Sequence, residues 1–249
     1  MEKQSHHQPE ESSMSRRDAL RRMLAGGAAL ISAFTPLSTH AEEPDKLKTY
    51  IDFDNLPKDE EYVYLLLFEN NPNDRNTSDD FIADAAQTMG YGHPNYWHSE
   101  VAYFDQDKKE WMAVGCRPPT CSGDLPVSQL KSKFRGYKVS VRQLHVPLGQ
   151  QTKARQWFEQ NLQNQPYNLA GPLLTNCTDA VVALGQQGNV KEVQGIRYKT
   201  RDEIKNRQGI AGFLDRWKKA SVDDILYRDS IVFPDELEKM GKHIGTMQF

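Results

Sequence analysis

The chain has 249 residues, of which 38% are hydrophobic and 26% charged, and its formal net charge is −3. This composition is typical of a globular protein with one sizeable core. Neither heptads nor a repeat of 20 to 50 residues is present, and no apolar window beyond residue 41 is long enough for a membrane span. Acidic and basic residues are well mixed, so no basic stripe favours a nucleic-acid partner.

The first 41 residues have the pattern of an export signal. The basic segment SRRDALRR precedes the apolar run MLAGGAALISAF, and the small residues Thr39 and Ala41 precede a possible cleavage point. The pair Arg16-Arg17 resembles the twin-arginine signal of bacteria, although Ala19 stands where that signal usually has Phe. We expect cleavage near Ala41 and a periplasmic mature protein. The alternative is a basic amphipathic tail.

The rest of the chain mixes strands and helices without regular alternation, which predicts an α+β fold. Residues 42–60 are expected to be a polar leader, and 61–249 a single domain. Hydrophobic periodicity and turn signals predict strands over 61–68 and 137–146, a hairpin over 96–116, and helices over 79–89 and 152–164. Residues 186–232 are expected to be loops with a short amphipathic helix around Phe213, Leu214 and Trp217.

Three cysteines in an oxidising compartment leave one thiol without a cysteine partner. Cys116 and Cys121 enclose the short loop RPPT and could form a tight disulfide, which would leave Cys177 free. A competing hypothesis is a zinc site formed by His93, His98, Cys116 and Cys121. Their spacing lacks the close pairs of strong zinc motifs.

The segment LLTNCTDAVVALG contains the clearest local signal in the sequence. Asn176 is a good N-cap, Asp179 completes a pattern like a capping box, and Gly185 is expected to end the helix. Cys177 then occupies the first helical position, where free backbone N–H groups and the helix dipole stabilise a thiolate. The competing interpretation is a small hydrophobic core residue, as free cysteines often are.

A nucleophilic cysteine needs a base within hydrogen-bond reach. Four histidines follow residue 41: His243 lies in a polar tail, His145 at a strand end and His93 in a turn. His98 lies on a strand whose residues alternate between two faces, so it is the histidine most suited to the interior. A structural histidine on that strand is the alternative.

Read together, these features resemble the permuted papain-like fold of the NlpC-type cysteine hydrolases. That group is related to lecithin–retinol acyltransferases, and in it the histidine precedes the cysteine. The likeness spans 62–240 and is carried by Trp97-His98, the approach from Tyr167 to Cys177, and the late segment IVFPDEL. It implies an antiparallel sheet packed on the cysteine helix, and a thiol hydrolase that needs no cofactor.

The resemblance also implies roles for individual residues. Cys177 would attack an amide, ester or thioester carbonyl, His98 would take the thiol proton and protonate the leaving group, and the Cys177 N–H would help bind the oxyanion. The family usually has a third polar residue on the strand after the histidine. Here that strand reads WMAVGC, so Glu100, on the His98 face, and Glu110, at the hairpin return, are the candidate substitutes.

The sequence thus predicts a periplasmic cysteine hydrolase acting on peptide, cell-wall or acyl substrates. Peptidoglycan peptides fit the predicted location. An acyltransferase or lipid-amide hydrolase of the same fold stays open, because fold does not determine substrate. A catalytically inactive binding module that keeps the fold is a further alternative.

Overall fold

The computed structural model describes residues 50–69, 95–117, 119–167, 176–206, 211, 214–215 and 230–249. Several sequence-based predictions lie outside these ranges. They are the export signal over 1–41, the helix over 79–89 and the turn with His93. Of the late amphipathic helix predicted around Phe213, Leu214 and Trp217, the described ranges include only Leu214.

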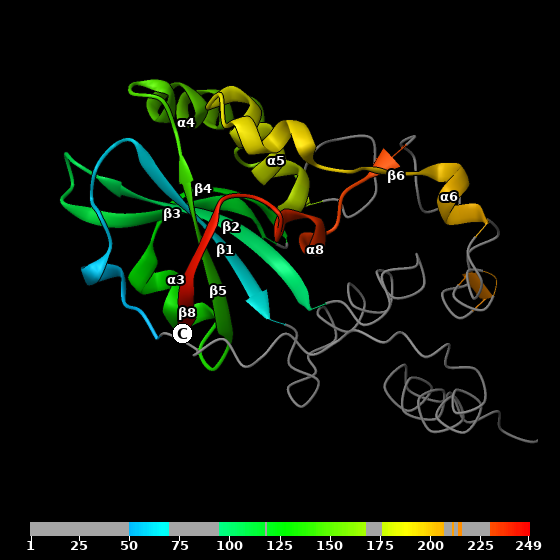
Figure 1. The fold of residues 1–249 in the computed structure, drawn as a ribbon, viewed down its shortest axis with the longest axis horizontal. Helices are drawn as coiled ribbons and strands as arrows, with labels where there is room; N and C mark the ends of the chain where they lie inside the picture. Colours follow the sequence, from blue (N-terminus) through cyan, green and yellow to red (C-terminus); the bar gives the residue numbers. More distant parts are fainter. Residues whose placement is uncertain are drawn as a thin grey trace, which may run out of the picture. The chain divides into compact units, whose positions relative to one another are not determined.

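A six-stranded antiparallel sheet is the centre of the described domain, with strand order β4-β3-β2-β1-β5-β8 (Figure 1). The strands are β1 Tyr62–Glu69, β2 Tyr96–Asp105, β3 Glu110–Arg117, β4 Thr120–Pro126, β5 Lys138–His145 and β8 Lys242–Gln248. β2 and β3 form the predicted hairpin. A second, two-stranded sheet pairs β6 Lys199–Thr200 with β7 Ser230–Ile231.

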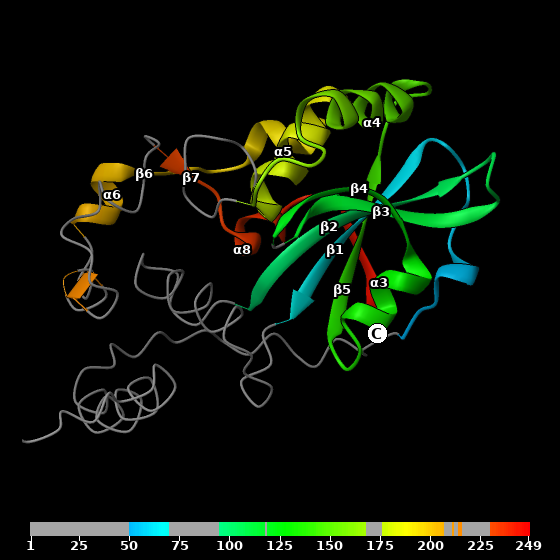
Figure 2. The same ribbon diagram turned by 180° about the vertical axis from the view of Figure 1, so that it is seen from behind.

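Helices cover both faces of the large sheet. The described helices are α3 Val127–Lys133, α4 Gln150–Asn161, α5 Cys177–Gln187, α6 Arg201–Lys205 and α8 Pro234–Leu237, with 3-10 turns at Phe53–Asn55 and Lys191–Gly195. In both ribbon views α4 and α5 lie on one side of the sheet and α3 on the other (Figures 1 and 2). The α+β class is confirmed, as is an antiparallel sheet packed on the cysteine helix.

Strand β1 shows why the core has two halves. Its apolar run alternates, so that Leu65 and Leu67 pack with the cluster beneath α4 and α5, while Leu66 and Phe68 pack with the cluster beneath α3. All four side chains are fully buried. A nearly continuous apolar sequence is what a strand covered on both faces requires.

Two terminal segments differ from the prediction. Residues 50–60 are not a detached leader within the described range: Phe53 and Leu56 are buried, and the Ile51 N–H donates to the Thr246 carbonyl at 3.1 Å. His243 belongs to edge strand β8 rather than to a polar tail. Both segments gain their structure from pairing with distant strands, which local composition does not encode.

Gly185 does not end the cysteine helix. Helix α5 continues to Gln187, and Gly188 follows as its C-cap. A Cβ atom at Gly185 would lie only 2.3 Å from Val193 Cγ2, so glycine permits the close approach of the following 3-10 turn. In the described parts of the chain, no helix has the length and apolar character needed to cross a bilayer.

Candidate active site

Cys177 occupies the first position of helix α5, as the capping pattern predicted. The Asn176 side-chain oxygen accepts a hydrogen bond from the Asp179 N–H at 2.7 Å, which fixes the start of the helix. The Cys177 side chain is 3% exposed. The thiol therefore lies at the positive end of a capped helix, where negative charge is stabilised.

The other two cysteines form the predicted disulfide. Cys116 on β3 and Cys121 on β4 are directly paired across the strands and bonded, and Cys177 is the free thiol. A disulfide sulfur is no longer the thiolate that zinc requires, so the proposed zinc site is wrong in two of its four ligands. The described residues contain no cluster of three or more His, Cys, Asp or Glu side chains suited to a metal.

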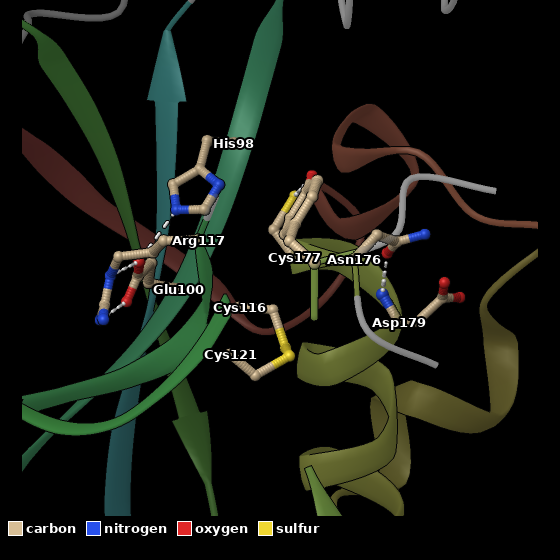
Figure 3. The surroundings of a disulfide bond; sticks show 9 residues. His98, Glu100, Cys116, Arg117, Cys121, Asn176, Cys177 and Asp179 are labelled. Carbon is tan, nitrogen blue, oxygen red and sulfur yellow. Dashed lines mark hydrogen bonds and ion pairs between the residues drawn. A yellow bond between two sulfur atoms is a disulfide. The ribbon is translucent and has the colours of Figure 1, made fainter. Parts of the chain in front are cut away.

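His98 on β2 lies between Glu100 and Cys177 (Figure 3). Its Nε2 atom is 2.9 Å from Glu100 Oε1. Its buried Nδ1 atom has no oxygen or nitrogen partner within the described residues, and it points to the side of Cys177. Three aromatic rings surround the imidazole with centroids 5.2 to 5.5 Å away: Phe68, Trp97 and Phe134.

The electrostatics favour a thiolate–imidazolium pair. Burial by itself would lower the pKa of His98 and raise that of Cys177. The attraction between the two partners' charges is the largest opposing effect, and with the contacts to Glu100 and Thr178 it outweighs burial, so the pKa of His98 rises to about 9 and that of Cys177 falls below its usual value. A hydrogen bond from the Ser99 backbone N–H to the sulfur favours the thiolate further.

Glu100 is held by a residue that the sequence analysis missed. Arg117, at the end of β3, donates a hydrogen bond from Nη2 to Glu100 Oε2, and its Nε forms an ion pair with Glu100 Oε1. Neither side chain is more than 1% exposed. Burial would raise the pKa of Glu100, but the Arg117 charge and the hydrogen bond to His98 lower it. A buried row of four side chains, in which acidic and basic groups alternate, thus runs from Cys177 through His98 and Glu100 to Arg117.

Arg117 follows immediately after the apolar segment WMAVGC. A strand that stops at Cys116 contains no third polar residue, whereas β3 extends one residue further and includes Arg117. Alternation from Gly115 places Arg117 on the Glu100 face of the hairpin. A Cβ atom at Gly115 would lie 3.0 Å from Glu100 Oε2, so glycine leaves room for the carboxylate. Glu110, the other predicted substitute, is exposed at the far end of the hairpin, opposite Asp105.

Tyr167 reaches the cysteine from the segment that follows α4. This segment is bound through its backbone to β4 and to the residue before it: the Cys121 N–H donates to the Gln165 carbonyl, and the Tyr167 N–H to the Pro119 carbonyl, both at 2.8 Å. The Tyr167 hydroxyl donates to Cys177 Sγ at 3.9 Å. Burial and the Cys177 charge raise the pKa of Tyr167, so its hydroxyl keeps its proton and can donate.

The Pro-Asp turn at the start of α8 lies at the beginning of β2. Asp235 Oδ1 accepts a hydrogen bond from the Asn95 N–H at 2.8 Å, three residues before His98. Burial raises the pKa of Asp235 to about 6. This turn therefore anchors the start of the strand that carries His98.

The structure brings together Cys177, His98 and Glu100, and adds Arg117 and Tyr167 to them. A thiolate beside an imidazolium, with a carboxylate on the far ring nitrogen, can attack an electrophilic carbonyl and pass a proton to the leaving group. None of the protein-family models, curated proteins or solved structures matches this chain.

Proposed function

We propose that the protein is an exported cysteine hydrolase that cleaves an amide or ester bond through a thiol acyl-enzyme. The observation that carries this proposal is the buried arrangement of Cys177, His98 and Glu100. Each member has a physical reason for its place: a capped helix start for the thiol, an aromatic enclosure for the imidazole and a paired strand for the carboxylate.

We propose further that the fold is the permuted papain-like fold. Chain order supports this proposal, because the histidine strand precedes the cysteine helix. The packing of α5 against β2 and β3 of an antiparallel sheet supports it as well. The Pro-Asp turn beside β2 is a third point of likeness.

In the first half of the proposed reaction, the Cys177 thiolate attacks the substrate carbonyl carbon and forms a carbon–sulfur bond, while the carbonyl electrons move to oxygen. The oxyanion would be bound by the Cys177 backbone N–H and by the Tyr167 hydroxyl, which donates to the sulfur at 3.9 Å. His98 then gives its proton to the leaving amine or alcohol, and the bond to that group breaks.

In the second half, water hydrolyses the thioester. Neutral His98 takes a proton from the attacking water, the second tetrahedral oxyanion collapses, and the thiolate leaves as the acid product departs. Glu100 accepts from the far ring nitrogen throughout, so that it holds one orientation of the imidazole and stabilises its charged form.

The proposed location is the periplasm, on the basis of the signal pattern over 1–41. In that compartment we propose the peptides of the cell wall as the substrate class, with acyl esters and acyl amides as the alternative outcome. Sequencing the N-terminus of the exported protein tests the location: a start at residue 42 supports it, and a start at residue 1 contradicts it.

The activity is tested by incubating the purified full chain separately with peptidoglycan stem peptides, an acyl ester and an N-acyl amide, and analysing the products by mass spectrometry. The matched control is Cys177→Ala. We expect cleavage of one class by the wild type and none by the variant. Equal product from both proteins would contradict the proposed nucleophile.

A further inference from the structure

The Glu100 carboxylate is fully buried, and it forms ion pairs with Arg117 and, when the imidazole is protonated, with His98. Arg117 is the partner whose charge does not depend on proton transfer at the site. A carboxylate without such a partner inside a protein takes up a proton, because burial penalises the charged form. A protonated Glu100 would no longer attract the charge on His98. The state of the imidazole therefore depends on a residue that does not touch it.

The other charged groups near Glu100 do not replace Arg117. His98 on β2 contacts one carboxylate oxygen, and Cys177 on α5 lies beyond His98. Burial and then the Arg117 charge lower the pKa of Lys133 on α3, while the Glu100 charge acts in the opposite direction. Within the described residues, however, Lys133 forms no ion pair with Glu100.

The position of Arg117 is itself fixed by the fold. It is the last residue of β3, it pairs with Thr120 on β4, and its neighbour Cys116 is bonded to Cys121. The guanidinium presents two donors in a planar fork, which matches the two oxygens of a carboxylate better than an ammonium group does. This geometry defines both the charge and the orientation of Glu100.

We propose that Arg117 is a positioning residue that acts through Glu100: it holds this carboxylate ionised and in place, and so keeps His98 charged and directed at Cys177. The inference rests on the proposed function, because it assigns a role in preparing the same nucleophile. It extends the charged part of the site beyond Cys177, His98 and Glu100 to a residue that acts on the imidazole only through the carboxylate.

The test is the pH dependence of Cys177 alkylation by iodoacetamide in the full chain. Cys177 is the free thiol, so the reaction reports one group. In Arg117→Met we expect the midpoint of alkylation to move up by about 1 to 3 pH units, because Glu100 becomes neutral and stops supporting the imidazolium. Arg117→Lys keeps the charge but not the fork, so its midpoint should lie between those of wild type and Arg117→Met.

Two further proteins separate positioning from folding. The double variant Glu100→Gln/Arg117→Met leaves no uncompensated charge, and we expect the same midpoint as in Glu100→Gln alone, since Arg117 has nothing left to act through. Arg155→Met is the control, because Arg155 is likewise an arginine paired with a carboxylate, but it is half-buried, lies on α4 and pairs with Asp124. Its midpoint should equal that of the wild type, and circular dichroism verifies folding.

The outcomes distinguish the two proposals. A low midpoint in the wild type that Arg117→Met leaves unchanged would overturn the role of Arg117 while supporting the proposed nucleophile. A further upward shift in the double variant relative to Glu100→Gln would show that Arg117 does not act through the carboxylate. An ordinary thiol midpoint in the wild type, unchanged in Arg117→Met, would contradict both proposals.

Discussion

The carboxylate of Glu100 lies 2.9 Å from His98 Nε2, and both side chains are buried. The two residues are separated by one position on β2, so the strand itself sets their spacing. This contact uses the ring nitrogen that points away from the thiol. The nitrogen on the thiol side is thus kept available for proton transfer.

Glu100→Gln should lower kcat/KM by about 10² to 10⁴-fold, because a neutral amide neither supports the imidazolium nor selects one ring orientation. Glu110→Gln is the control, at the exposed position that the sequence also suggested, and should leave kcat/KM unchanged. Removing one partner of a buried ion pair costs about 3 to 5 kcal/mol of stability, so rates are measured well below the melting temperature. Equal activity of the wild type and Glu100→Gln would remove Glu100 from the mechanism.

Cys177→Ala and His98→Ala should each reduce turnover by about 10³-fold or more, because nucleophile and base act as a unit. In Cys177→Ala the loss of the buried sulfur costs about 1 kcal/mol, or roughly 2 to 4 °C in melting temperature, because His98 can release its proton and so leaves no unpaired charge. Steady-state kinetics and calorimetry provide the two readouts. His98→Ala also leaves a cavity among aromatic rings, so its stability is not diagnostic. A large fall in melting temperature for Cys177→Ala would instead support a purely structural role of the thiol in the core.

Gly115→Ala should reduce kcat/KM by up to about 10²-fold, because the new methyl group displaces the Glu100 carboxylate and with it His98. Its Cβ would lie 3.0 Å from Glu100 Oε2. Gly195→Ala is the control, since a Cβ there meets no atom within 4 Å. If the two alanine variants were equally active, the clearance at Gly115 would have no functional role.

Asp235→Asn should change the pH dependence of stability. The folded-state pKa of about 6 exceeds the ordinary value of 3.8, so the folded protein holds this proton more tightly. The contribution of Asp235 is complete below about pH 3.8 and is lost as the pH rises through about 6. The melting temperature at about pH 5 minus that at about pH 8 should therefore be smaller in Asp235→Asn than in wild type.

The control for this comparison is Asp54→Asn, at an exposed carboxyl of the first 3-10 turn. It should retain the wild-type difference between the two pH values. If Asp235→Asn behaved like the control, burial of Asp235 would not affect the stability of the Pro-Asp turn.

Local signals in the sequence predicted the parts of the site that depend on local physics. The N-cap at Asn176 identified the start of α5, and strand alternation put Glu100 on the same face as His98. Both inferences use interactions within a few residues. They required no knowledge of which strands become neighbours.

Arg117 and edge strand β8 were missed because they depend on pairing across the chain. Arg117 becomes a partner of Glu100 only when β3 is placed beside β2, with Gly115 across from the carboxylate. Gly185 was misread for a similar reason: its role comes from contact with Val193 rather than from helix termination. Hydrophobic periodicity describes one element at a time, whereas register joins elements.

The most direct test of the central claim is labelling of the full chain with a thiol-reactive acyl probe at about pH 7, followed by peptide mapping. A thiolate paired with an imidazolium is nucleophilic at a pH where an ordinary thiol is largely protonated. We expect one acyl group per chain, on Cys177, and loss of labelling in His98→Ala. Acylation elsewhere, or labelling of Cys177 that does not depend on His98, would contradict the account.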